Sequence, residues 1–191
     1  MASVEIFCCY ARKDQSLLNE LKMHLIPLQR HGLINMWNET DISPGRDREE
    51  EIKKHLHTAQ IILLLVSPAF IASDYCSNQM SQAMERHEQG EARVIPVILR
   101  DTIWHETPFG KLEALPTGAK PVTSSWRNRN VAFHNVAEGV RKTVEELTTV
   151  FAQRTETIPD PIITALGKMP TSSTISQTPL STTSRKTKKQ Y

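Results

Sequence analysis

Residues 59–66 read AQIILLLV, a run that is apolar at every position from Ile61 to Val66. A strand with apolar side chains on both faces is typical of the middle of a parallel sheet that helices cover on each side. Ser67-Pro68 ends the run. The run is far shorter than the roughly 20 residues that a membrane-spanning helix needs, so no membrane partner is expected.

Three further apolar runs flank this strand, at residues 4–10 (VEIFCCY), 33–37 (LINMW) and 93–99 (RVIPVIL). Each is rich in β-branched or aromatic residues and has the length of a strand. Pro96 lacks a backbone N–H and therefore predicts that the last of them lies near the edge of the sheet. Pro121-Val122 is expected to supply a very short fifth strand.

Helical spacing of apolar residues separates these strands, at residues 15–31, 46–58 and 75–89, and a final helix is expected after Asn130. Asp14 is expected to cap the first helix through its side chain. Strands that alternate with helices predict an α/β fold with a doubly wound parallel sheet of about five strands and helices on both faces.

The composition divides the chain into two parts. Residues 1–152 are predicted to form one domain, and residues 153–191 a disordered tail or linker rich in Ser, Thr, Pro and Lys. The net charge of the whole chain is only +2, so no nucleic-acid partner is expected. The cluster of basic residues at 185–189 is interpreted as solubilising.

The three cysteines, Cys8, Cys9 and Cys76, cannot all pair with one another. The chain shows neither a C-x-x-C motif nor a signal peptide at its N-terminus. Reduced thiols in a cytoplasmic protein without a metal site are therefore expected.

Ligands of open parallel α/β sheets bind outside the carboxyl ends of the strands. This rule selects four segments of the chain, residues 10–14, 38–48, 67–75 and 100–104. The sequence contains neither G-x-G-x-x-G nor G-x-x-x-x-G-K-[ST], so neither of the common glycine-rich phosphate loops is present.

At these four segments the chain resembles the Toll/interleukin-1 receptor (TIR) family in its bacterial form. The matching stretches are residues 5–14 (EIFCCYARKD), residues 37–45 ending in DISPG, residues 63–76 (LLLVSPAFIASDYC) and residues 93–100 (RVIPVILR). The resemblance covers about residues 3–150 and implies the flavodoxin-like TIR fold. Residues 37–45 correspond to the second box and BB loop of the family.

The resemblance implies one of two functions. Some TIR domains cleave NAD at the nicotinamide–ribose bond, and the bacterial enzymes act in antiphage immune signalling; NAD is then a substrate and no cofactor is bound permanently. Other TIR domains are non-catalytic scaffolds that self-associate, in some cases as filaments. The implied partners are NAD or an ADP-ribose-type nucleotide, other TIR domains, and an unknown effector or sensor protein.

In TIR enzymes a glutamate five residues after the aspartate of the S-D-[WY] motif stabilises the cationic ribose. Counted from Asp74, that position is Gln79. Glutamine keeps the shape and the hydrogen bonding of glutamate and loses its charge. On the same helix, Glu85 and Glu88 lie about 240° and 180° away from Gln79 and cannot replace it. Three interpretations stay open: a deliberate substitution, a naturally silent adaptor, or a wrong register.

The other candidate site residues line the selected loops. They are Tyr10, Ala11, Asp14, Trp37, Asp41, Pro44, Gly45, Arg46, Ser73 and Tyr75. Trp37 either stacks on a base or nicotinamide or packs at a strand end, and Arg46 either pairs with a phosphate or is a solvated charge. Asp41 is either functional or a turn residue. Arg48 stands where bacterial members often have tryptophan, which is a departure from the family pattern.

Overall fold

The structure is a computed structural model and describes residues 3–156, with side chains described up to residue 150. The tail or linker predicted for residues 153–191 lies outside the described residues from position 157 onward. None of the helices in the described part of the chain is long and apolar enough to cross a membrane.

A four-stranded parallel sheet forms the centre of the fold, in the order β2-β1-β3-β4. Its strands are β1 (Val4–Tyr10), β2 (Ile34–Trp37), β3 (Ile61–Val66) and β4 (Arg93–Ile98). Strand β3 is buried along its whole length, as its continuous apolar run predicts. Strand β4 lies at one edge of the sheet, where the missing backbone N–H of Pro96 disturbs few of the hydrogen bonds between strands.

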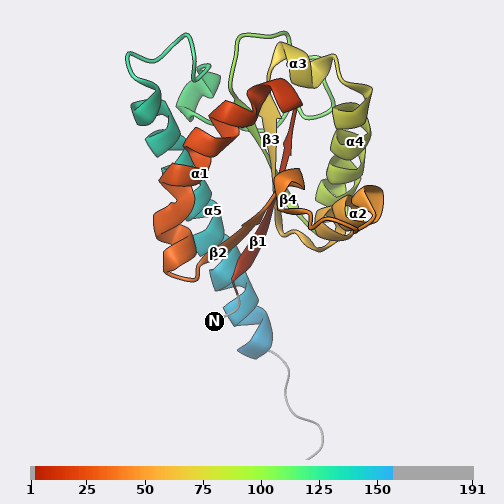
Figure 1. Ribbon diagram of the computed structural model, residues 1–191. Helices are drawn as coiled ribbons and strands as arrows, with labels where there is room; N and C mark the ends of the chain where they lie inside the picture. The colour runs from red at the N-terminus through yellow and green to blue at the C-terminus, as the bar shows by residue number, and fades with distance from the viewer. Residues whose placement is uncertain (1–2, 157–191) are drawn as a thin grey trace, which may run out of the picture. The chain divides into compact units, whose positions relative to one another are not determined.

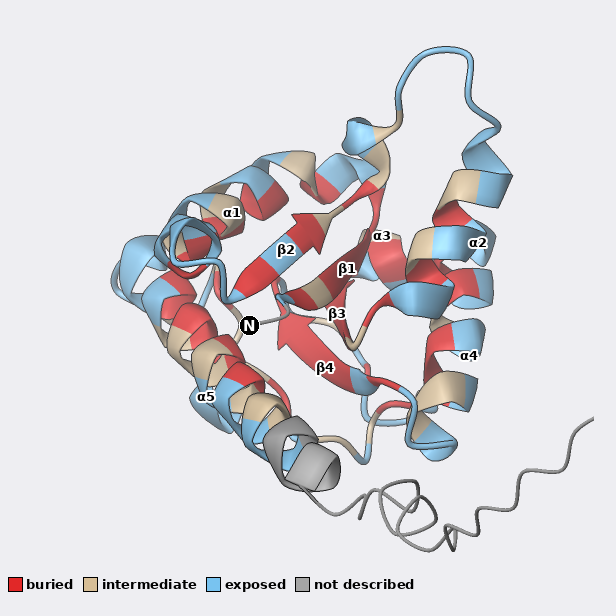
Figure 2. Ribbon diagram, turned by 90° about the horizontal axis from the view of Figure 1, so that it is seen from below, coloured by how far each residue is buried: buried red, intermediate tan, exposed pale blue. Residues whose placement is uncertain are grey.

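Helices cover both faces of this sheet. They are α1 (Gln15–Arg30), α2 (Arg48–Thr58), α3 (Pro68–Ile71), α4 (Asp74–Glu88) and α5 (Arg129–Glu156). Helices α1 and α5 lie against one face, whereas α2, α3 and α4 lie against the other (Figure 1). The view from below shows the buried strands between these two layers (Figure 2). The doubly wound α/β fold is therefore confirmed.

The alternation of side chains along each strand divides the core into two clusters. On β1, for example, Cys8 and Tyr10 pack towards α1 and α5, whereas Phe7 and Cys9 pack towards α2 and α4. Helix α1 ends where Gly32 adopts a φ of +69°, a conformation that glycine reaches without strain.

The fifth strand expected at Pro121-Val122 is not a strand within the described residues. The Val122 N–H donates to the Ile98 carbonyl oxygen over 3.0 Å, and Leu115 forms an isolated bridge with Val97. Single residues of an irregular segment thus form backbone hydrogen bonds with the free edge of β4. A sequence pattern cannot separate such isolated contacts from a short ladder.

Candidate functional site

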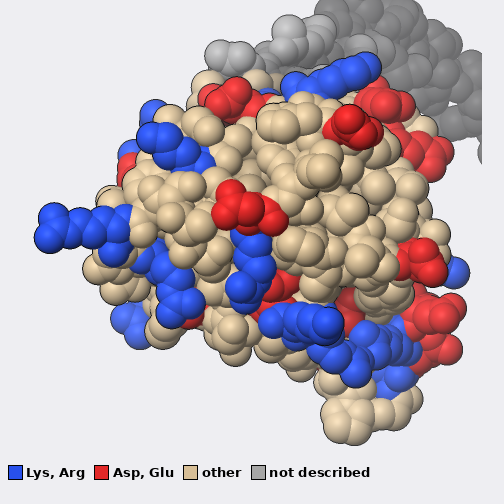
Figure 3. Space-filling model, turned by 90° about the horizontal axis from the view of Figure 1, so that it is seen from above, with Lys and Arg blue, Asp and Glu red and all other residues tan. Residues whose placement is uncertain are grey.

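A cavity of about 930 Å³ opens at the carboxyl ends of the strands. This volume lies near the upper end of the range of about 300–1,000 Å³ that is typical of small-molecule sites. Its wall comes from the segment after β1, the segment after β2, helix α2, residues 69–73 in and after α3, and the start of α4. Viewed from above, basic side chains run across this face with acidic side chains between them (Figure 3).

Glu39 lies in this wall because the backbone after β2 is fixed by two neighbours. It belongs to a short 3-10 helix, η2 (Glu39–Asp41), that begins with a capping box. The buried Asn38 side chain accepts the Thr40 N–H over 3.1 Å, and Asp41 accepts the Asn38 N–H over 3.1 Å. These bonds hold the Glu39 side chain directed at the cavity.

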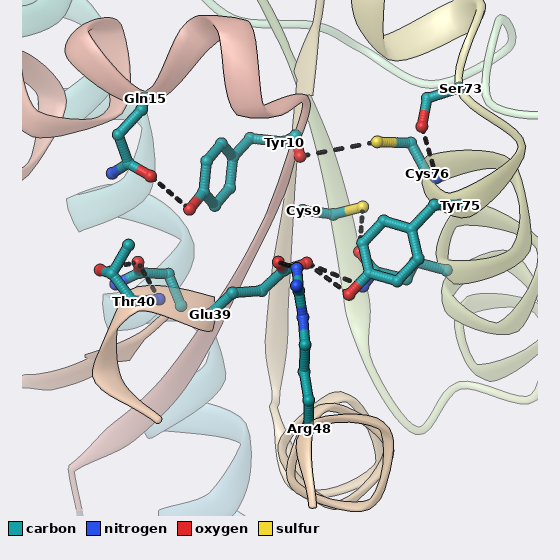
Figure 4. A network of polar contacts seen from close by, with 11 residues as sticks. Cys9, Tyr10, Gln15, Glu39, Thr40, Arg48, Ser73, Tyr75 and Cys76 are labelled. Atoms are coloured by element: carbon teal, nitrogen blue, oxygen red, sulfur yellow. Dashed lines mark hydrogen bonds and ion pairs between the residues drawn. The ribbon is translucent and has the colours of Figure 1, made fainter. Parts of the chain in front are cut away.

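Three side chains from two helices converge on the Glu39 carboxylate (Figure 4). The Tyr75 hydroxyl donates to Oε1 over 2.5 Å, and the Gln79 amide donates to the same oxygen over 3.3 Å. The Arg48 guanidinium pairs with Oε2 and lies 5.6 Å from the centre of the Tyr75 ring. The carboxylate is therefore held in place, although 13% of the Glu39 side chain stays exposed.

Gln79 lies behind this carboxylate, facing the core. Only 4% of the residue is exposed, and it does not line the cavity itself. The Cys9 thiol donates to Gln79 Oε1 over 2.8 Å, while the Gln79 amide nitrogen donates to Glu39. Both ends of the side chain are thus occupied, and Gln79 reaches the cavity only through Glu39.

The two tyrosines of the cavity stay protonated at neutral pH. Burial and the negative charge of Glu39 raise the pKa of Tyr10 to about 12. Burial and the hydrogen bond to Glu39 also raise the pKa of Tyr75. The Tyr75 hydroxyl is therefore a donor to the carboxylate and not a base.

Two thiols at the cavity, Cys76 in its wall and Cys9 outside the wall, differ in their acidity. Burial raises the pKa of Cys9 well above its ordinary value. Hydrogen bonding with Cys9 lowers the pKa of Cys76 to about 7, against the opposing effect of burial. Although Cys76 lines the cavity, it is only 1% exposed and its thiol donates to the Tyr10 carbonyl oxygen over 3.5 Å, which favours a packing role over that of a nucleophile.

Four of the predicted site residues line the cavity: Tyr10, Ala11, Ser73 and Tyr75. Ser73 also begins helix α4, where its hydroxyl accepts the Cys76 N–H over 3.3 Å. Tyr10 directs its hydroxyl to Gln15 Oε1 over 2.5 Å. The rule that ligands bind at the carboxyl ends of strands thus selects residues that the fold does bring together.

Asp14 lies outside the cavity wall and is 1% exposed. Its side chain makes no capping bond with helix α1, contrary to the expectation from its position before the helix. Instead it pairs with Arg100 over 3.0 Å and accepts the Ser67 hydroxyl. A buried carboxylate needs a charged partner and hydrogen bonds, and these two side chains supply both.

The Trp37 ring is stacked with two other rings and does not line the cavity. Its ring centre lies 5.4 Å from that of Phe7 and 4.2 Å from that of His55. The indole is thus already stacked with two side chains of the domain, which favours the packing interpretation over stacking on a base. Asp41 caps η2 and pairs with Lys22 over 3.7 Å, in keeping with a turn residue.

The exposed loop between η2 and α2 holds Pro44, Gly45 and Arg46, and none of the three lines the cavity. Gly45 has a φ of +86°, which completes the turn that Pro44-Gly45 predicts. Arg46 lies 3.9 Å from Glu51 and its side chain is 70% exposed, which favours the interpretation as a solvated charge.

Glu39 and its partner Arg48 are the site residues that the sequence did not reveal. Both lie within the selected segment 38–48, and Glu39 stands two residues after the end of β2. A carboxylate in this position, at the carboxyl end of a strand, is the sequence signal that marks Glu39. The family resemblance instead places the catalytic acidic group on the helix that carries Gln79.

Fold and cavity together define an α/β domain with a small-molecule-sized cleft at the carboxyl edge of a parallel sheet. The TIR-domain family model matches residues 6–128, and the chain therefore belongs to the TIR-domain family. The family expected from the sequence is thus confirmed.

A relative from Sinorhizobium fredii, the uncharacterized protein y4lF, is 46% identical over 144 residues. The match covers 75% of this chain and 44% of that relative, so the chain spans less than half of the relative's length. The fold is similar to the TIR domain of the Toll-related receptor TRR-2 from Hydra magnipapillata, with a TM-score of 0.50 at 21% identity. That match covers 71% of this chain and 97% of the receptor domain.

Proposed function

We propose that this TIR domain binds NAD in the cleft and cleaves the bond between nicotinamide and ribose. The observation that carries the proposal is a fixed carboxylate in the wall of a cavity of about 930 Å³ at the carboxyl edge of the sheet. The aromatic side chains of Tyr10 and Tyr75 flank it, and the exposed Arg12 and Lys13 lie on the same wall, where phosphates need cations.

The chemistry needs little beyond a well-placed negative charge. When the bond breaks, its electron pair leaves with nicotinamide, which departs as a neutral molecule and needs no strong acid. The ribose carbon takes up the positive charge, and a carboxylate beside it lowers the energy of that state. Water then adds to the carbon, and ADP-ribose and one proton are released.

Nicotinamide release from NAD by the purified chain tests this proposal directly. A variant that fills the cavity, Ala72→Trp, is expected to abolish both NAD binding and nicotinamide release, because Ala72 lines the wall. Ser81→Trp is the matched control, since Ser81 is exposed on α4 outside the cavity and receives the same bulk. If calorimetry detects no NAD binding by the unsubstituted chain, the proposed function is wrong.

A second candidate function rests on the loop at residues 43–47. All five of its residues are exposed and none lines the cavity, so the loop is available to a neighbouring TIR domain. Head-to-tail contacts of this kind build open filaments instead of closed dimers. A scaffold of this type assembles without nucleotide, so light scattering with and without NAD separates the two functions, with Arg46→Glu expected to reduce the assembly.

The two functions are compatible, because a filament contact at the loop leaves the cavity open. The cellular role that fits both is antiphage immune signalling in a bacterial cytoplasm, with an effector or sensor as the partner. This role, and the function of the longer protein that the Sinorhizobium relative represents, belong to the proposal.

A further inference from the structure

The cavity wall contains two carboxylates, and they differ in their surroundings. Glu49 is exposed at the rim, whereas the Glu39 side chain is 13% exposed and is held by Tyr75, Gln79 and Arg48. A charge in a fixed, partly dehydrated position acts more strongly on a reacting centre than a solvated one does. Glu39 is therefore the carboxylate of the wall best placed for electrostatic stabilisation.

The contact between Glu39 and Gln79 joins two positions that lie 40 residues apart in the chain. Its geometry shows one carboxylate and one amide, with the amide nitrogen 3.3 Å from the carboxylate oxygen. The Gln79 amide is a neutral donor, so the pair carries a single negative charge, on Glu39. A glutamate at position 79 would place a second charge in contact with the first.

Arg48 occupies the other side of the same carboxylate. Its guanidinium pairs with Glu39 and lies 5.6 Å from the centre of the Tyr75 ring, so it combines an ion pair with a cation–π contact. These two groups, a carboxylate and an aromatic face, also suit the flat cationic ring of oxidised nicotinamide. The Arg48 side chain is 49% exposed and can move away from this place without crossing the core.

We infer that Glu39 supplies the carboxylate that faces the cationic nicotinamide and the cleavable bond, with Arg48 as its counter-ion while no substrate is bound. The inference rests on the proposed function, and it moves the electrostatic role from position 79 to the loop after β2. Gln79 is then a positioning residue, which orients Glu39 and is itself held by Cys9.

This assignment changes what the Gln79→Glu variant is expected to do. Two carboxylates in contact do not both ionise readily, and one of them takes up a proton. The variant therefore adds less than one full negative charge to the site. Under this inference it does not exceed the unsubstituted chain in activity, in contrast to the gain expected if position 79 alone carries the charge.

The test compares the affinities for NAD and for its reduced form, NADH, whose nicotinamide ring carries no positive charge. The unsubstituted chain is expected to bind NAD about fivefold to tenfold more tightly than NADH, because Glu39 attracts the cationic ring. Glu39→Gln is expected to remove this preference while NADH binding stays within about twofold. Glu50→Gln, which removes an exposed carboxylate outside the cavity, is expected to retain it.

The double variant Glu39→Gln with Gln79→Glu returns one carboxylate to the pair at its other position. It is expected to regain part of the preference for NAD, and a swap that regains none would assign the loss to damaged structure and overturn the inference. A Glu39→Gln chain that keeps the full preference also overturns it, while the proposed function stands. Absence of binding to either nucleotide removes the proposed function, and the inference with it.

Discussion

Two carboxylates lie at the carboxyl edge of the same sheet, and each pairs with an arginine and a hydroxyl. Asp14 pairs with Arg100 and Ser67, while Glu39 pairs with Arg48 and Tyr75. The Asp14 side chain is 2% exposed, and the Glu39 side chain is 13% exposed and faces the cavity. The same three chemical groups thus form one cluster that is buried and one that faces the cavity.

The difference lies in what each carboxylate connects. Asp14 follows β1, Ser67 follows β3 and Arg100 follows β4, so the Asp14 cluster ties together the ends of three strands. Glu39 instead meets side chains that project from α2 and α4 across the opening of the cavity. Chemical type alone therefore does not identify a functional carboxylate, whereas access to a cavity does.

The largest effect expected from this comparison is on the rate of NAD cleavage. Glu39→Gln is expected to lower the rate of nicotinamide release by about 10²- to 10³-fold, which is the usual loss for one well-placed electrostatic group. Asp14→Asn is expected to leave the rate per folded molecule within about threefold. Chromatographic measurement of nicotinamide from both variants checks this, and equal losses in the two would end the distinction.

Stability is expected to respond in the opposite order. Asp14→Asn turns an amide towards Arg100 or Ser67 and removes a buried charge, at a cost of about 2 kcal/mol in the free energy of unfolding. Glu39→Gln breaks a partly exposed pair and is expected to cost less than about 1 kcal/mol. Urea denaturation of the two variants measures both values. A larger loss in Glu39→Gln would make Glu39 a structural residue.

The sequence predicts well the strands and loops that position the two carboxylates. The apolar run at 61–66 places the central strand, and Pro96 places β4 at an edge, because both signals are local and depend on burial or on a missing N–H. The four loops of the carboxyl edge follow from the parallel order of the strands. Four of the predicted site residues accordingly line the cavity.

The side-chain pairs within those loops depend on contacts that local patterns do not contain. Asp14 has the position of a helix cap, but Arg100, 86 residues further along the chain, pairs with its side chain. Trp37 has the position of a base-stacking residue, but its ring is stacked with those of His55 and Phe7. Glu39 becomes notable only because Gln79, on another element, points at it.

The two clusters are also expected to differ in their response to alkaline pH. The Cys9 thiol supports the Glu39 cluster through Gln79, and burial raises its pKa well above the ordinary value of about 9. Because the folded chain holds the proton of this thiol more tightly than the unfolded chain does, the contribution of the thiol to the free energy of unfolding is fully present below pH 9. As the pH rises above 9, the free energy of unfolding falls by about 1.4 kcal/mol per pH unit.

Cys9→Ser isolates this contribution, because serine keeps a donor for Gln79 and does not titrate in this range. Urea denaturation between pH 8 and pH 11 is expected to show a slope that is shallower in the variant by about one proton, or about 1.4 kcal/mol per pH unit. Asp14→Asn is expected to keep the slope of the unsubstituted chain, since its cluster contains no thiol. Equal slopes for Cys9→Ser and the unsubstituted chain would show that ionisation of Cys9 does not lower the stability at alkaline pH.

The smallest expected effect concerns Arg48, the exposed half of the Glu39 pair. Arg48→Ala removes the counter-ion that a cationic nicotinamide has to displace, and a partly exposed ion pair is worth about 0–1 kcal/mol. Affinity for NAD is therefore expected to rise by up to about fivefold, with little change for NADH. A fall in affinity for both nucleotides by the same factor would instead show that Arg48 binds a phosphate. Arg100→Ala is the matched control, because its carboxylate partner lies outside the cavity and both affinities should stay unchanged.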